Sequence, residues 1–186
     1  MKKSTLGIVI VLAIILVFAF IYSYSTRQAN GPQPEPIGQN GEVDTSDWQT
    51  YRNEELGFEF KYPREWFLRS SNQLVSITSY DPYDETLPLH ASPESKLFKL
   101  EIKKIHNSEN LTLENWIDNN LAHEGIATVL SREYIEIDGE EAIKSIHQYG
   151  SFTTTPIYIK KDNFIYILNG NTNRAIDSII NGFRFI

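Results

Sequence analysis

The chain has 186 residues, of which 41% are hydrophobic and 22% charged, a composition typical of a folded globular protein. It contains no cysteine, which excludes disulfide bonds, thiolate metal centres, cysteine nucleophiles and the lipidated cysteine of a bacterial lipoprotein. Three of the 17 basic residues (Lys2, Lys3 and Arg27) precede the first acidic residue. The rest of the chain contains the other 14 basic residues and all 24 acidic residues, so its net charge is −10. Such a surface repels phosphates, so we expect no nucleic-acid partner.

An apolar N-terminal segment predicts a membrane anchor. Residues 6–22 carry no charge, and as a helix they would be about 26 Å long, close to the thickness of the bilayer core. A cleaved signal peptide is the alternative, but its apolar core is typically only about 7–15 residues long and no Ala-x-Ala site follows here. Because Lys2 and Lys3 precede the segment, the N-terminus is expected in the cytoplasm. We therefore expect residues 1–25 to be a single-pass anchor in the cell membrane.

A spacer and one extracytoplasmic domain are predicted after the anchor. Residues 26–47 contain Pro32, Pro34 and Pro36 at alternate positions with glycines on both sides, a pattern that favours an extended polyproline-type linker. Residues 48–186 are enough for one domain that buries its own core.

The stretch FEFKYPREW, residues 58–66, is predicted to be structural. Phe58, Phe60 and Tyr62 alternate with charged residues, so they share one face of a strand. Pro63 lacks an N–H group and ends that strand. Trp66 and Phe67 are then expected to fold back onto the same apolar face. No nucleophile with a base occurs here, which favours a role in the core.

The same patterns locate the remaining elements. Thr112 is expected to cap a helix whose apolar stripe includes Trp116 and Ile117, and which ends at Gly125. Asp138-Gly139 is a hairpin-turn signal. Further strands are predicted at 48–51, 74–80, 97–105, 131–137, 142–149, 155–160, 164–169 and 183–186, and a short helix at 175–181. The predicted fold class is α+β, with an antiparallel sheet of six or seven strands and two or three helices packed on it.

Candidate chemistry is confined to one loop. Residues 81–95 form a long segment with three prolines, and loops of this length are often functional. Weak metal-ligand candidates within it are Asp81, Asp84, Glu85 and His90, whose oxygen and imidazole groups suit a divalent cation. The alternative is a solvated acidic loop, which is also the expectation for Asp138, Glu140 and Glu141 at the hairpin tip. No common nucleotide-binding, hydrolase or zinc-protease motif is present, and no cofactor is expected.

Three segments resemble a known family. The stretches TYRNEELGFEFKYPREW (50–66), LTLENWIDNNL (111–121) and SIINGFRFI (178–186) are similar to PsbP-like domains of bacterial membrane-anchored proteins. The resemblance implies an α/β/α sandwich around an antiparallel sheet, and a protein that does not catalyse a reaction. Its photosynthetic member supports the oxygen-evolving centre, and a eukaryotic relative in fold binds the GTPase Ran. The shared motifs are packing motifs, so the resemblance implies a fold rather than a particular partner.

Three functional hypotheses remain from the sequence. The first is an anchored, non-enzymatic module that binds a protein partner or supports an envelope assembly, through the wet face of the sheet or the 81–95 loop. The second is a metal-dependent hydrolase that uses Asp81, Asp84 or His90. The third is a carrier of a small ligand in a pocket lined by Tyr80, Tyr83 and Trp116.

Overall fold

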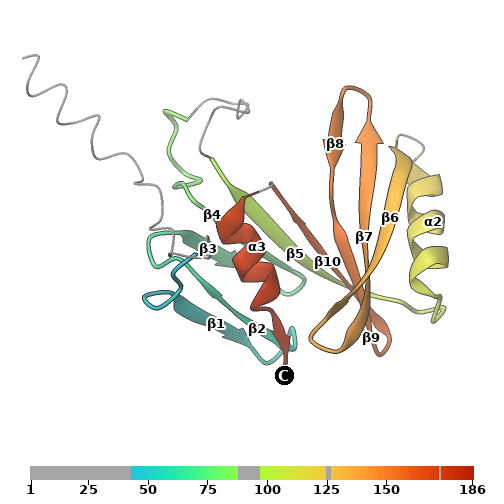
Figure 1. Ribbon diagram of the computed structural model, residues 1–186, viewed down its shortest axis with the longest axis horizontal. Helices are drawn as coiled ribbons and strands as arrows, with labels where there is room; N and C mark the ends of the chain where they lie inside the picture. Colours follow the sequence, from blue (N-terminus) through green and yellow to red (C-terminus); the bar gives the residue numbers. More distant parts are fainter. Residues whose placement is uncertain (1–42, 88–96, 125–126, 172) are drawn as a thin grey trace, which may run out of the picture.

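The domain is built from two antiparallel sheets and two helices (Figure 1). The computed structural model describes residues 43–87, 97–124, 127–171 and 173–186, without the side chains of residues 122–124. The small sheet has the order β1-β2-β11, and the large sheet the order β3-β4-β5-β10-β9-β7-β6, with β8 also paired to β7. The strands are β1 (Gln49–Asn53), β2 (Phe58–Tyr62), β3 (Phe67–Ser70), β4 (Leu74–Thr78), β5 (Lys99–His106), β6 (Ala127–Ile137), β7 (Glu140–Tyr149), β8 (Phe152–Thr154), β9 (Ile157–Lys161), β10 (Phe164–Gly170) and β11 (Arg184–Phe185).

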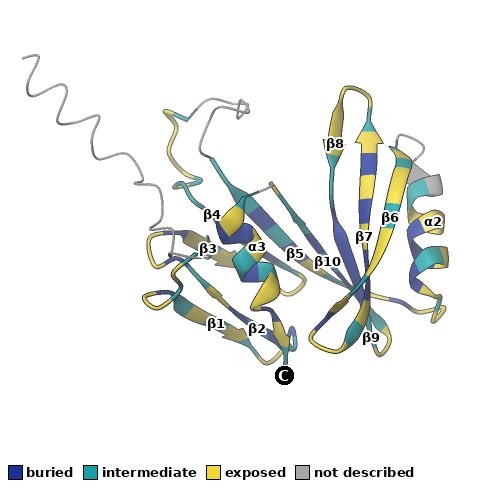
Figure 2. Cartoon of the chain, viewed as in Figure 1, coloured by how far each residue is buried: buried dark blue, intermediate teal, exposed yellow. Residues whose placement is uncertain are grey.

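The large sheet is the middle of three layers. Helix α3 (Arg174–Asn181) and the small sheet cover one face, and helix α2 (Leu113–Glu124) packs on the other (Figures 1 and 2). The expected helix–sheet–helix layering is therefore present, and the small sheet, which was not expected, joins α3 in one outer layer. Within the described ranges, neither helix is long and apolar enough to span a bilayer. The predicted anchor, residues 1–25, and nearly all of the predicted linker lie outside these ranges.

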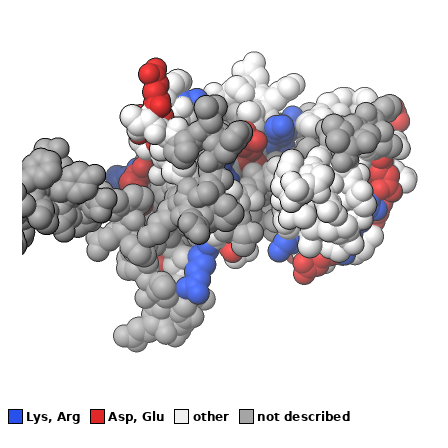
Figure 3. Space-filling view, turned by 90° about the horizontal axis from the view of Figure 1, so that it is seen from above, with Lys and Arg blue, Asp and Glu red and all other residues white. Residues whose placement is uncertain are grey.

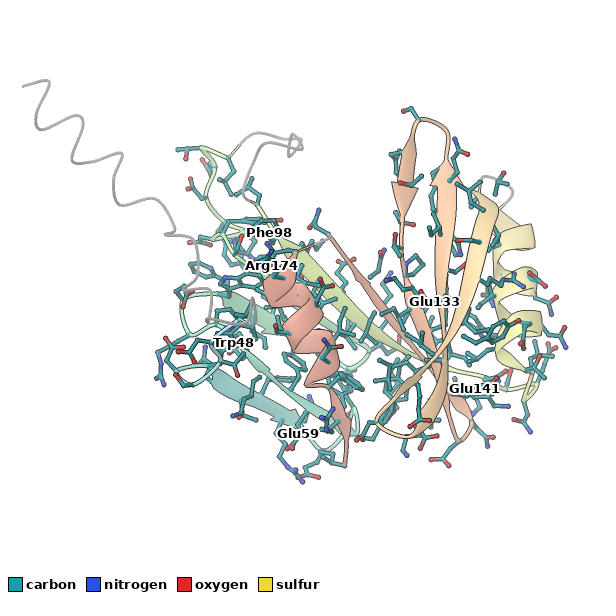
Figure 4. The ribbon with its side chains drawn as sticks, in the orientation of Figure 1. Trp48, Glu59, Phe98, Glu133, Glu141 and Arg174 are labelled. Atoms are coloured by element: carbon teal, nitrogen blue, oxygen red, sulfur yellow. The ribbon has the colours of Figure 1, made fainter. Side chains whose placement is uncertain are left out.

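The larger core confirms a structural role for the 58–66 stretch. Phe58, Phe60 and Trp66 are all buried, and the Phe58 ring lies 5.0 Å from that of Phe183 next to α3. Trp48 and Phe98, labelled in Figure 4, pack into the same cluster. The prediction for Phe67 was wrong: it begins β3 and is 43% exposed. The reversal at residues 63–66 turns Trp66 inward, so its neighbour in the new strand points the opposite way.

A buried tyrosine joins the two sheets. Tyr166 on β10 donates a hydrogen bond of 2.9 Å from its hydroxyl group to the carbonyl oxygen of Leu56, in the turn between β1 and β2. Burial, with a smaller effect from Asp162, raises the pKa of Tyr166 to about 12. The hydrogen bond satisfies a carbonyl that would otherwise be buried without a partner.

A smaller core lies under α2. Leu113, Trp116 and Ile117 form the predicted stripe and pack against Ile143 of β7 and Ile165 of β10. The side chain of Thr112 accepts a hydrogen bond of 3.3 Å from the backbone N–H of Asn115, which confirms the predicted cap. The helix is therefore attached to the sheet by its middle and capped at its start.

Most predicted strands are present, but their grouping differs from the prediction. The 138–139 turn joins β6 and β7, with Asp138 and Gly139 both at positive φ (52° and 80°), as a tight hairpin requires. Short strands β3 and β8 were not predicted, and the described residues form eleven strands in two sheets rather than one sheet of six or seven. Strands of three or four residues leave too few alternations to read from a sequence.

Candidate functional site

One face of the large sheet is only partly covered. Along β4 and β5, alternate residues such as Val75, Ile77, Leu100 and Ile102 point into the larger core. Their neighbours in the sequence face the side on which α2 packs, and there they line two depressions. We call this surface the open face and define it by Arg69, Leu74, Ser76, Lys99, Glu101 and Lys103.

The first depression lies over β3, β4 and β5. It has a volume of about 320 Å³, and its lining includes Arg69, Ser76, Tyr80 and Lys99. The Arg69 guanidinium lies 3.7 Å from the centre of the Tyr83 ring, a cation–π contact between two exposed side chains. Its lining therefore brings several hydroxyl groups and the Arg69 cation to one hollow.

The second depression, which we call the Trp116 pocket, lies between α2 and strands β5 and β10. It has a volume of about 220 Å³, and its lining includes Trp116, Tyr158, Ile167 and Lys103. Glu101 borders both depressions, so they follow one another along the open face. This pocket has an aromatic base, in contrast to the first depression.

Charge on the open face differs from that of the domain as a whole. Arg69, Lys99 and Lys103 are basic, and Glu101 is the acidic member of the set. Lys99 and Glu101 form an ion pair of 2.8 Å. The face therefore carries a positive excess on its strands within a domain of net negative charge, which favours partners with acidic or acceptor groups.

An uncharged end adjoins the Trp116 pocket. Residues 145–159, which run from β7 through β8 into β9, contain no Asp, Glu, Lys or Arg, and this end of the molecule is largely white in Figure 3. Phe152 is 61% exposed and stacks on Tyr149 at 5.6 Å. The aromatic surface of the pocket therefore continues outward onto β8.

A serine–histidine pair lies in the interior of this half of the sheet. The Nε2 atom of His147 is 2.9 Å from the Oγ atom of Ser145, and both residues are fully buried. Ser145 also donates to the carbonyl oxygen of Ser131 at 3.3 Å. Without access to a substrate, this contact holds β6 and β7 together rather than forming a nucleophile. The S-x-H spacing on one strand face was a usable signal that sequence reasoning passed over.

The predicted metal ligands are only partly described. Asp81 accepts a hydrogen bond from the backbone N–H of Tyr83 at 2.9 Å, and Asp84 accepts from both the N–H and the hydroxyl group of Thr86. Those bonds from Thr86 hold the pKa of Asp84 below its usual value. Within the parts of the chain that the structure describes, no three acidic or histidine side chains are grouped so that they could hold a metal ion. His90 lies outside these parts, so the four-residue set stays a prediction.

The predicted small-ligand pocket is not formed as expected. Tyr80 lines the first depression, Trp116 lines the Trp116 pocket, and Tyr83 is 78% exposed beside Arg69. Sequence reasoning grouped these rings because they are aromatic, but the positions of α2 and β4 on the sheet separate them.

Two of the acidic residues at the hairpin tip, Asp138 and Glu140, are structural, whereas Glu141 is exposed. Asp138 accepts a hydrogen bond of 2.8 Å from the backbone N–H of Phe185 in β11, and Glu140 forms an ion pair of 2.6 Å with Lys161. The hydrogen bond to Glu140 raises the pKa of Lys161. These contacts tie the hairpin to β11 and β9, which a local reading of DGEE could not reveal.

A sequence comparison identifies the family. The chain matches the family described as PsbP-like protein over residues 7–185, and it belongs to that family. No curated protein matches the sequence.

Solved structures with a similar arrangement come from several organisms. One is the solution structure of cyanobacterial PsbP from Synechocystis, with 16% identity, a TM-score of 0.49, and coverage of 81% of this chain and 99% of that one. Another is the Ran-binding protein Mog1p of Saccharomyces cerevisiae, with 6% identity, a TM-score of 0.48, and coverage of 74% and 95%. A protein from Bacteroides thetaiotaomicron has 9% identity, a TM-score of 0.46, and coverage of 75% and 49%. The family assignment rests on the sequence match.

Proposed function

We propose that this protein is a membrane-tethered, extracytoplasmic, non-enzymatic module that binds a protein partner through its open face. The observation that carries the proposal is the contrast between that face and the rest of the sheet. The open face is hollowed by two depressions and carries three basic side chains against one acidic one, whereas the opposite side is closed by α3 and the small sheet. A surface that the fold leaves uncovered, and whose charge is opposite in sign to that of the rest of the domain, can select a partner of complementary charge.

The tether and the location follow from the predicted anchor. Residues 6–22 are long enough to cross a bilayer, and Lys2 and Lys3 favour a cytoplasmic N-terminus. The linker would then let the domain reach a neighbour in the membrane or envelope. Protease treatment of intact and opened cells tests this part, because only an extracytoplasmic domain is cleaved while the membrane is sealed.

The burial of the Ser145–His147 pair favours binding over catalysis. Among the described residues, the Ser145–His147 contact that resembles part of a hydrolytic site is fully buried. The open face instead presents cations and hydroxyl groups, which suit recognition of an acidic protein surface. A metal-dependent hydrolase is tested separately by calcium or zinc titration of the melting temperature, since a native-state ligand raises it.

Site-specific crosslinking tests the open face directly. A photo-reactive amino acid at Ser76, on the open face, is expected to capture a defined partner in membranes, whereas one at Thr50, on the exposed side of β1, is not. The double change Arg69→Glu and Lys103→Glu should abolish the Ser76 crosslink, while Lys61→Glu with Lys144→Glu, a matched reversal elsewhere, should keep it. A crosslink that survives the open-face reversal, or that appears equally from Thr50, contradicts the proposal.

A further inference from the structure

The Trp116 pocket owes its existence to a division in the large sheet. Pro156 separates β8 from β9, and only β9 pairs with β10, over Ile157–Lys161. Above that point β8 follows β7 away from β10, and the two halves of the sheet diverge (Figure 1). The pocket lies where α2 and the diverging strands meet, because Pro156, Trp116 and Asn169 all line it. It is thus a product of the backbone, and not of one flexible side chain.

The base of the pocket is aromatic and fixed in place. The rings of Trp116 and Tyr158 lie 6.0 Å apart, and each residue is only 7% exposed, so one edge of each faces the hollow. Tyr158 in turn stacks on His147 at 5.8 Å, and His147 contacts Tyr149 at 6.4 Å. Rings held by other rings lose little entropy when a ligand packs on them, which favours a flat apolar ligand.

The size of the pocket limits the ligand. A cavity of about 150 Å³ accommodates benzene. The Trp116 pocket, with about 220 Å³, therefore has room for one six-membered ring and a short substituent. A fused ring system with a long chain would exceed it.

The rim of the pocket supplies one cation without a carboxylate. Glu101 is paired with Lys99 at 2.8 Å, whereas Lys103 has no acidic side chain within 4 Å among the residues that the structure describes. The side-chain nitrogen of Asn120 donates to the carbonyl oxygen of Trp116 at 2.8 Å, which orients its amide group at the same rim. The net negative charge of the domain repels anions at long range, but salt screens charges beyond about 8 Å. The short-range attraction to Lys103 therefore determines whether an anion binds in the pocket.

We propose that the Trp116 pocket binds a small monocarboxylate with a flat apolar body, of the size of a monocyclic aromatic acid. The ring lies on Trp116 and Tyr158, and the carboxylate pairs with the ammonium group of Lys103. The pocket shares Glu101 and Lys103 with the open face, so the two proposals need different readouts: the indole signals report the ligand, and the Ser76 crosslink reports the partner.

Phenylacetate is the probe, with phenylacetamide as its neutral counterpart. The full chain, in lipid nanodiscs and with ¹⁵N-labelled tryptophan, gives three indole N–H signals, which single Trp→Phe changes assign. Phenylacetate should move the Trp116 signal with a dissociation constant of about 1 mM or tighter, as expected for a ligand of this size. The signals of Trp48 and Trp66, which belong to the larger core, serve as internal controls and should not move.

The charge requirement separates this site from general hydrophobic binding. Lys103→Gln and the change from acid to amide should each weaken binding about tenfold, as loss of one charge-assisted contact predicts. Lys61→Gln, at an exposed lysine on β2, should leave binding unchanged. The proposal is overturned if about 10 mM phenylacetate leaves Trp116 unmoved, if all three indoles move together, or if the amide binds as well as the acid.

Discussion

On one side of the large sheet, α3 and the small sheet cover β4, β5, β9 and β10, whereas on the other side α2 packs on β6, β7, β9 and β10. The closed side gathers residues from both ends of the domain, such as Phe58, Ile176 and Phe183. The partly covered side holds a smaller cluster and both depressions. The closed side therefore supplies the larger core, and the proposed recognition lies on the opposite face of the sheet, so substitutions on the two faces should have different consequences.

The largest expected effect is on the closed side. Phe58→Ala should lower the free energy of unfolding by about 3–5 kcal/mol, because a fully buried ring leaves a cavity among four other rings. Urea denaturation of the purified full chain measures the loss. Phe67→Ala is the control: it also removes a phenyl ring, but one that is 43% exposed, so the loss should stay below about 1 kcal/mol. Equal losses would contradict the division of the two faces.

Truncating a core side chain under α2 should lower the free energy of unfolding by a smaller amount. Ile117 is fully buried against Ile143 and Tyr158, but it also borders the Trp116 pocket. We expect Ile117→Ala to cost about 2–3 kcal/mol, at the lower end of the range for such changes, because neighbouring groups and water can move into the space. Asn119→Ala, at an exposed position on the same helix, should change stability by less than about 0.5 kcal/mol. A loss for Ile117→Ala larger than that for Phe58→Ala would reverse the proposed order.

The hydrogen bond that links the two sheets can be tested by removing the hydroxyl oxygen of Tyr166. Tyr166→Phe leaves the carbonyl of Leu56 without its donor and should cost about 1–3 kcal/mol. Tyr134→Phe, at a side chain that is 63% exposed, is the control and should have almost no effect.

The effect of Tyr166→Phe on stability should depend on pH. The pKa of Tyr166 is raised to about 12, mainly by burial, whereas that of an unfolded tyrosine is about 10. Below about pH 10 the hydroxyl is protonated in both states and its contribution is complete; it is lost as the pH rises from about 10 to 12, because the unfolded chain ionises first. The wild-type protein should therefore lose more stability across this window than Tyr166→Phe. Parallel pH profiles of the two proteins would contradict this.

The two faces also differ in how much of their structure can be predicted from the sequence. The closed side follows from local patterns: Phe58 and Phe60 of the period-two aromatics are buried, with Tyr62 half-buried beside them, and the stripe of Ala175, Ile176 and Ile179 is buried as expected. The open face depends on pairings over long sequence distances, such as β5 with β10, which no local pattern encodes. The Trp116 pocket combines residues of α2, β5, β7, β8, β9 and β10, so they could not be grouped from the sequence. The same holds for Asp138, whose partner in β11 is 47 positions away.

A helix cap on the closed side should have a smaller effect than any core change. The side chain of Asn173 accepts a hydrogen bond of 2.7 Å from the backbone N–H of Ala175 at the start of α3. Asn173→Ala should cost about 1 kcal/mol, because that N–H loses its acceptor. Asn173→Asp keeps an acceptor oxygen and should restore most of the stability, as urea denaturation of both variants can show. Equal losses for Ala and Asp would mean that the side chain acts by packing and not as a cap.

The smallest effect on stability is expected where the effect on binding is largest. Lys103 is exposed, forms no ion pair among the described residues, and lies on the open face. Lys103→Glu should change the free energy of unfolding by less than about 0.5 kcal/mol, the same as Lys61→Glu on the small sheet. Only Lys103→Glu should weaken phenylacetate binding and the Ser76 crosslink, since it replaces the cation of the pocket with an anion. If Lys103 instead contributed to stability, Lys103→Glu and Lys61→Glu would differ in their urea midpoints but would bind phenylacetate equally well. That result would contradict the proposed role of Lys103 in binding.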